Sequence, residues 1–215
     1  MRLATSLLIL SILPISANAG FVGGFKAETG VWQTKIDGNA HGIAAGPNVA
    51  YAHDRYFGAM GFTIGNYFGD NDATFGRNEL DISLGYRILP NISGFLAFKQ
   101  SYISYDSTPT ELSFSDTIST TGGGIAFSYP VTHELIAIGT LSMDYSIDNY
   151  KSSQQNVSGK GLGNTGEIGL SYRVAKRTSV NARMKGQATV LNYDETQTSW
   201  NTRIWKLGLD VVHAF

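Results

Sequence analysis

The chain has 215 residues, of which 25 are glycine and none is cysteine, and only 15% are charged, against about 25% in soluble globular domains. Without cysteine, a disulfide-stapled secreted module and a zinc site built on thiolates are excluded. A hydrophobic content of 42% argues against disorder, and a formal net charge of −1 gives no electrostatic reason to expect a nucleic acid partner. One domain is the expectation at this length.

The first nineteen residues have the three parts of a secretory signal peptide. Arg2 supplies a positive start, an apolar run follows at residues 7–13, and the small-residue segment Ala17-Asn18-Ala19 ends it. This run is too short for a membrane anchor, which needs about 20 apolar residues. We therefore predict that residues 1–19 are a signal peptide and that residues 20–215 form the mature domain.

After residue 20, apolar and polar residues alternate with a period of two, which is typical of β-strands. Leu80, Ile82 and Leu84 are apolar, for example, whereas the interleaved Glu79 and Asp81 are charged. The alternation predicts ten strands, at residues 25–36, 43–53, 55–68, 78–89, 92–106, 117–130, 134–149, 164–175, 178–193 and 199–215. Gly46-Pro47 weakens the second of them, so eight strands are the alternative.

The polar faces of these strands carry charges of both signs, mixed with glycine, alanine and serine. This mixture suits a crowded interior, in which acids and bases pair, better than the water-exposed face of a soluble sandwich. Closing the strands into a cylinder also pairs every strand edge, as lipid requires. We predict an all-β fold, an up-and-down antiparallel transmembrane β-barrel. The residues expected in its lumen are Lys26, Glu28, Glu79, Asp81, Arg87, Lys99, Asp144, Glu167, Arg173, Arg183, Lys185, Lys206 and Asp210.

Aromatic residues lie near the ends of the apolar faces, as at the two interfaces of a membrane barrel. One group is spaced 43 residues apart, and each member ends a strand on the short-turn side, Phe215 at the chain terminus: Tyr86, Tyr129, Tyr172 and Phe215. A second group is expected at the opposite, loop-side interface, and it includes Trp32, Tyr193 and Trp200.

The last strand resembles the C-terminal signature of Gram-negative outer-membrane β-barrel proteins. Phe215 ends the chain, and apolar residues occupy alternate positions before it, namely Trp205, Leu207, Leu209 and Val211. His213 departs from the aromatic or aliphatic residue usual at its position. The resemblance implies a location in the outer membrane, among its lipid and lipopolysaccharide, and insertion by the barrel assembly machinery. It identifies a superfamily and no particular member.

Some small barrels of this superfamily are enzymes that act at the extracellular rim. Omptin-like proteases use an acidic pair with an Asp-His pair, and the nearest counterparts here are Asp70, Asp72 and His41. A solvated turn explains the two aspartates better, because the other histidines fall on the opposite side of the membrane. A lipid A deacylase would need a serine placed near His213, which the sequence lacks. We predict no catalytic residue, no metal site and no cofactor.

The interior charges allow two interpretations, a narrow aqueous path and a sealed, interlocked lumen. A barrel of about 8 strands is just filled by side chains, and ten strands give slightly more room, which favours the sealed or intermittently conducting form. The predicted function is a non-enzymatic outer-membrane barrel, either a narrow or sealed channel for small solutes or a structural component of the envelope. The alternatives are a rim enzyme acting on peptides or lipid A, and a surface-binding protein working through the loop 151–164. The solute and the oligomeric state stay open.

Overall fold

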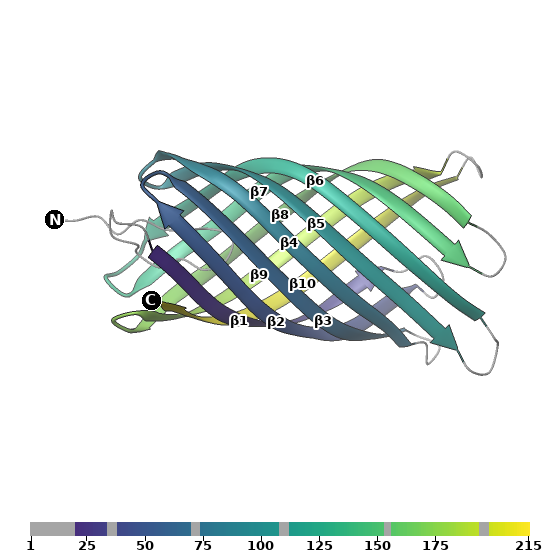
Figure 1. The fold of residues 1–215 in the computed structure, drawn as a ribbon, viewed down its shortest axis with the longest axis horizontal. Coiled ribbons are helices and arrows are strands. Elements are labelled where there is room, and N and C mark those ends of the chain that lie inside the picture. The colour runs from purple at the N-terminus through teal and green to yellow at the C-terminus, as the bar shows by residue number, and fades with distance from the viewer. Residues whose placement is uncertain (1–19, 34–37, 70–73, 108–111, 153–155, 194–197) are drawn as a thin grey trace.

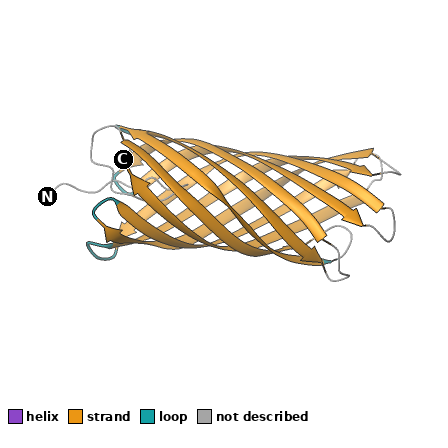
Figure 2. Cartoon of the chain, turned by 60° about the horizontal axis from the view of Figure 1, so that its bottom comes forward, coloured by secondary structure: helices purple, strands orange, loops and turns teal. Residues whose placement is uncertain are grey.

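The computed structural model describes residues 20–33, 38–69, 74–107, 112–152, 156–193 and 198–215. They form ten antiparallel strands in a closed barrel, in which each strand pairs with its sequence neighbours and β1 closes on β10 (Figures 1 and 2). The strands are β1 (Gly20–Gln33), β2 (Asn39–His53), β3 (Tyr56–Gly69), β4 (Thr74–Leu89), β5 (Ile92–Ser107), β6 (Leu112–Pro130), β7 (Leu135–Ser152), β8 (Asn156–Ala175), β9 (Thr178–Tyr193) and β10 (Thr198–Ala214). The predicted ten-strand fold is confirmed, and the eight-strand alternative is wrong.

The registers of the strand pairs set the tilt and width of the barrel. A walk through paired residues starts at Trp32 of β1, passes once around the barrel and returns to β1 at Gly20, twelve residues earlier. The residues on this walk are Ile204, Gln187, Thr165, Ser142, Gly124, Phe95, Gly85, Phe57 and Ala52. With ordinary strand spacings, this stagger corresponds to a tilt of about 40° and a backbone radius of about 10 Å. Side chains from opposite walls can therefore meet in the lumen.

The strands extend further than the sequence pattern predicts, at the end away from the short turns. β6 begins at Leu112 and β8 at Asn156, whereas the alternation predicts starts at 117 and 164. Beyond the membrane both faces of a strand meet polar surroundings, so the alternation fades although the hydrogen-bonded ladder continues. The predicted surface loop 151–164 is therefore wrong for its described part, which belongs to β7 and β8, and the glycine-rich segment 159–163 is strand. Residues 153–155 lie outside the described part.

Gly46 and Pro47 do not interrupt β2, contrary to the expectation that they would delay its start. β2 pairs with β1 through both residues, but its pairing with β3 skips from Ala45 to Asn48. Proline has no N–H to donate, which accounts for the gap on that side. At the same place the backbone of Phe62 approaches Gly46 so closely that a Cβ there would lie 1.9 Å from the Phe62 carbonyl oxygen.

The two ends of the barrel differ in their connections. Successive connections alternate between the two ends of the barrel. At one end they are short, with two residues between β2 and β3, between β4 and β5 and between β8 and β9, and four between β6 and β7. β1 begins and β10 ends at this same end, where Val22 pairs with Ala214 (Figure 1). Short turns are periplasmic in outer-membrane barrels, so this end is the periplasmic one and the opposite end is extracellular. No helix in the described ranges is long and apolar enough to cross a membrane.

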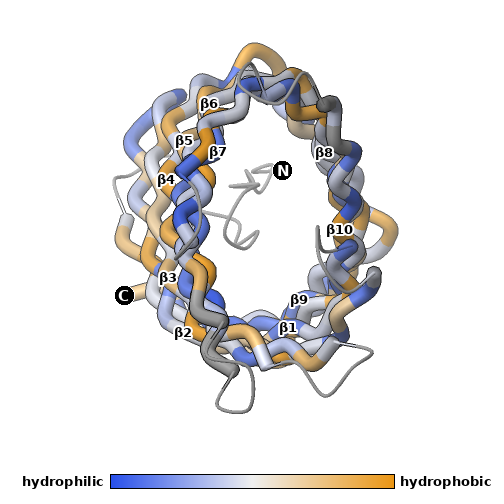
Figure 3. The backbone as a smooth tube through the Cα atoms, turned by 90° about the vertical axis from the view of Figure 1, so that its right-hand side faces the viewer, coloured by the Kyte–Doolittle hydropathy of each residue, from blue (hydrophilic) through white to orange (hydrophobic). Residues whose placement is uncertain are grey.

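Outward and inward faces have different chemistry along each strand. Outward positions carry exposed apolar residues such as Leu84, Leu96, Met143 and Leu207. Contact of these side chains with lipid tails is favourable, whereas their exposure to water would be unfavourable. In the end-on view of Figure 3, hydrophobic and hydrophilic residues alternate along the backbone of most strands.

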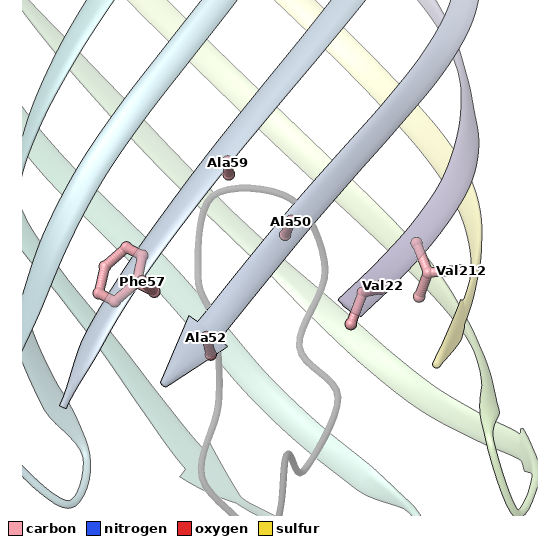
Figure 4. Packing of buried hydrophobic residues seen from close by; sticks show 6 residues of the cluster. All are labelled: Val22, Ala50, Ala52, Phe57, Ala59 and Val212. Atoms are coloured by element: carbon pink, nitrogen blue, oxygen red, sulfur yellow. The ribbon is translucent and has the colours of Figure 1, made fainter. Parts of the chain in front are cut away.

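The inward faces are layered from one end to the other. Near the periplasmic end lies a cluster of mostly small apolar side chains from β1, β2, β3 and β10 (Figure 4): Val22, Ala50, Ala52, Phe57, Ala59 and Val212. Charged residues occupy the middle of the lumen, and aromatic residues fill its extracellular part. The charged layer therefore lies between an apolar cluster on the periplasmic side and an aromatic cluster on the extracellular side.

Candidate functional site: the barrel lumen

All thirteen residues predicted for the lumen lie at inward-facing positions of the strands. The structure brings eleven of them together in the middle layer, whereas Arg87 and Arg173 lie apart, near the periplasmic turns. Arg87 donates there to the backbone carbonyl of Asp54 at 3.1 Å. The middle layer comprises Lys26, Glu28, Glu79, Asp81, Lys99, Asp144, Glu167, Arg183, Lys185, Lys206 and Asp210.

Glu79 of β4 is the centre of one group of charges. Its carboxylate accepts from Arg77 at 2.6 Å, from Lys206 at 2.6 Å and from Lys99 at 3.1 Å. The side chain of Glu79 is only 3% exposed, so these pairs are screened little by solvent. Arg77 was not among the predicted lumen residues, because the predicted strand began at 78. Continuing the alternation of β4 from Glu79 to two residues earlier places Arg77 on the inner face.

Glu28 of β1 continues this group across the barrel. It pairs with Lys206 and, at 3.3 Å, with Lys26. Lys26 in turn lies 4.0 Å from Asp81, the most loosely held of these carboxylates. Lys206 thus bridges Glu28 and Glu79, and so joins β10 to β1 and to β4 on the far wall.

Arg183 of β9 is the centre of a second group. Its guanidinium contacts Asp210 at 2.5 Å and Glu167 at 3.2 Å, and Asn181 donates to Asp210 at 2.7 Å. Close ionic hydrogen bonds of this kind between neighbouring strands offset the desolvation of the buried charges. These contacts hold β8, β9 and β10 together from the inside.

A cavity of about 130 Å³ lies between the two groups of charges. It has room for roughly ten water molecules. Lys185 lines it, and within the described part of the chain no carboxylate lies within ion-pair distance of its ammonium group. Asp144, on the wall formed by β7, accepts from Thr165 at 2.6 Å and from Ser142 at 2.9 Å. The middle of the lumen is therefore polar and has room for water.

An aromatic layer lies in the lumen above this chamber, on the extracellular side. Its fully or nearly fully buried members are Trp32, Tyr67, Phe75, Ile103 and Ile204, with Ala40 beside them. Trp32 and Phe75 meet edge to face with ring centroids 5.8 Å apart. Arg77 lies over Trp32 and Tyr67, at 5.3 Å and 5.8 Å from the ring centroids, and so links this layer to Glu79. A second cavity, of about 20 Å³, adjoins the layer.

Trp32 and Tyr193 were predicted at the outer interface, and this placement is wrong. Both occupy inward positions, at 4% and 6% exposure, because they share strand parity with the lumen residues below them. Tyr193 donates a hydrogen bond to Asp148 near the extracellular end. That a residue is aromatic does not by itself show whether it faces the lipid or the lumen.

The aromatic residues predicted beside the short turns all face outward. Tyr86, Tyr129, Tyr172 and Phe215 are 40% to 77% exposed at the periplasmic end of the apolar belt. Tyr56 packs against Tyr86 there, with ring centroids 5.1 Å apart. The side chain of Trp200 lies outside the described part of the structure, so its predicted interface position stays a prediction.

Of the three residues considered for a rim enzyme, His41 alone lies in the described part of the chain. Asp70 and Asp72 lie outside it. His41 faces outward from β2, with Val31 and Phe68 as its cross-strand neighbours. Across the described ranges, no group of three or more histidines and carboxylates could hold a metal ion.

A closed antiparallel barrel with an apolar belt, aromatic residues at its edge and a polar lumen has the architecture of an outer-membrane β-barrel. Comparison of the structure with solved proteins supports this fold. Neisserial surface protein A matches with a TM-score of 0.52 at 13% identity, over 92% of this chain and 99% of that one. The outer-membrane protease OmpT from Escherichia coli matches with a TM-score of 0.54 at 11% identity, over 92% and 96%.

The translocator domain of the autotransporter NalP from Neisseria meningitidis also matches, with a TM-score of 0.52 at 13% identity, over 94% of this chain and 90% of that domain. No protein family matches the sequence. No curated protein matches it either. At identities this low the likeness concerns the fold, and a surface protein, a protease and a translocator share it.

Proposed function

We propose that the protein is a non-enzymatic outer-membrane barrel whose lumen is closed to steady solute flow by the aromatic layer on its extracellular side. The observation that carries the proposal is the burial of Trp32, Tyr67 and Phe75 on the inner face of β1, β3 and β4, on the extracellular side of the charged chamber. Ions can be solvated in the chamber, but the layer above it offers them rings and aliphatic groups. Dehydrating an ion in such surroundings is costly, so the layer is the barrier to conduction.

The charge pattern of the chamber supports a sealed lumen over an open, selective pore. Its acids and bases are engaged mainly with one another, as in the contacts of Glu79 and Arg183. A pore that selects ions needs charges free to exchange contacts with the passing ion. Insertion by the barrel assembly machinery, which the C-terminal resemblance implies, stays a prediction.

Planar-bilayer recordings of the refolded mature chain test the proposal. We expect no steady current from the wild type and a steady ion current from the double variant Trp32→Ala/Phe75→Ala, because two rings are removed from the closed layer. Trp205→Leu is the matched control: Trp205 lies on β10 next to Trp32 but faces outward, at 58% exposure, so its replacement should leave the current unchanged.

Two outcomes would contradict the proposal. A large steady current from the wild type would show that the aromatic layer does not close the lumen. A correctly folded double variant that stays silent would show that the barrier lies elsewhere. Folding of each variant is checked by the shift in gel mobility on heating, so that an unfolded sample is not mistaken for a closed barrel.

A further inference from the structure

Two charges of the middle layer take no part in its ion pairs. Together with Arg77, the layer holds six bases and six acids, and ten of these twelve side chains form at least one ion pair. The other two are Lys185 and Asp144, which have no ion-pair partner within the described part of the chain. One base and one acid are therefore left over, and both line the chamber.

The strands on either side of Lys185 do not supply an anion for its ammonium group. Its cross-strand neighbour on β8 is Glu167, whose carboxylate contacts Arg183 at 3.2 Å. Its neighbour on β10 is Lys206, which carries the same charge and contacts Glu79 at 2.6 Å. The ammonium group of Lys185 thus has only the chamber in which to meet a negative charge.

Asp144, on the wall formed by β7, is buried with neutral donors alone. It is 7% exposed, and its two oxygens accept one hydrogen bond each, from Thr165 at 2.6 Å and from Ser142 at 2.9 Å. An ionised carboxylate accepts about four hydrogen bonds, so both oxygens can take a further donor. On the β6 side Gly122 leaves room for the carboxylate, because a Cβ there would overlap Oδ1 of Asp144. The site lacks a cation to offset the desolvation of this charge.

The strand registers place the two groups on different parts of the wall. Asp144 pairs with Gly163, and Gly163 pairs with Thr189, so Lys185 lies two strands and four residues away from Asp144. On a barrel of this radius, the two Cα atoms are about 15 Å apart. Both side chains point towards the axis, which leaves roughly 9 Å between the charged groups. An α-amino acid spans this gap with a hydrogen bond at each end.

We propose that the chamber binds a small α-amino acid in its zwitterionic form, with the carboxylate at Lys185 and the ammonium group at Asp144. A ligand with both charges is favoured over a simple anion or cation, because each of those would leave one of the two protein groups without a partner. The volume of about 130 Å³ admits a ligand of about ten non-hydrogen atoms. The proposal concerns occupancy of the chamber and does not rest on closure of the lumen above it.

Titration of the refolded protein with L-alanine, followed by saturation-transfer NMR in neutral detergent micelles, tests the proposal. Both ends of the barrel face solvent in a micelle, so binding is seen whichever end admits the ligand. We expect Lys185→Gln and Asp144→Asn each to bind L-alanine about ten-fold more weakly than the wild type, because each removes one ionic hydrogen bond. Lys160→Gln is the matched control: it removes an exposed, outward-facing lysine of β8 and should bind as the wild type does.

Analogues of L-alanine test the same pairing without any substitution. Propionate lacks the ammonium group and ethylamine lacks the carboxylate, so each should bind the wild type about ten-fold more weakly than L-alanine. L-tryptophan is too large for the chamber and should not compete. Absence of L-alanine binding to the wild type would overturn the proposal, as would equal binding by the wild type and folded Lys185→Gln. Propionate or ethylamine binding as tightly as L-alanine would overturn the assignment to a zwitterion. These outcomes are independent of the bilayer current.

Discussion

Replacing Glu79 by glutamine is expected to destabilise the folded barrel by about 3–5 kcal/mol. The substitution keeps the size of the side chain but removes the charge that Arg77, Lys99 and Lys206 share. Of these three cations only Lys206 keeps another carboxylate, that of Glu28. The cost arises because buried charges lose their partner without regaining water. Urea unfolding of the protein in lipid vesicles, followed by tryptophan fluorescence, measures the free energy.

Asp81→Asn is the matched control for this prediction, since it makes the same chemical change two residues along β4. The side chain of Asp81 is 30% exposed, and its ion pair with Lys26 spans 4.0 Å, so the loss should stay within about 1 kcal/mol. The double variant Glu79→Gln/Lys99→Met should recover part of the lost stability, because it removes one of the stranded cations. Equal unfolding free energies for Glu79→Gln and Asp81→Asn would refute the central role of Glu79.

Gly46→Ala is expected to destabilise the barrel by about 3 kcal/mol or to prevent its assembly. A Cβ at this position would lie 1.9 Å from the carbonyl oxygen of Phe62 and 2.8 Å from its carbon. Both are backbone atoms, so β2 and β3 must separate to make room. The separation costs ladder bonds at a place where Pro47 already leaves the pairing incomplete. The fraction of folded protein after refolding and its urea midpoint are the measurements.

Gly94→Ala tests whether adding a methyl group to any strand glycine has the same effect. Gly94 faces outward on β5, and the nearest atom to an added Cβ is Cδ1 of Ile88 at 3.5 Å, an ordinary contact. We expect a change within about 1 kcal/mol, and alanine lowers the entropy of the unfolded chain in its favour. If both variants unfold at the wild-type urea concentration, the close approach at Gly46 carries no energetic weight.

The sequence predicts those features of the barrel that depend on residues close together along the chain. The alternation of apolar and polar residues is a local signal, and it placed the strands wherever lipid faces one side and the lumen the other, as in β4. It failed where both sides are polar, which is why β8 begins eight residues before its predicted start. The prediction also failed for Trp32, which was placed on the outer face because it is aromatic. Its position in the alternation puts it on the inner face, where the structure has it.

The pairing of the lumen charges needed the tertiary structure. Parity alone puts Glu79 and Lys206 inside, but they are 127 residues apart, and nothing local specifies that they meet. Their contact depends on the stagger with which β1 closes on β10, and this stagger is the outcome of ten registers acting together. The same closure brings Trp32, Tyr67 and Phe75 into one layer.

The amino-acid sequence by itself thus determined that the chain forms a barrel and which side of each strand faces lipid, because side chains alternate every residue whatever the distant partners are. Only the tertiary structure decided which charges pair and which aromatic residues meet inside the lumen. Those features depend on the distance across the cylinder, which the shear and the number of strands set together.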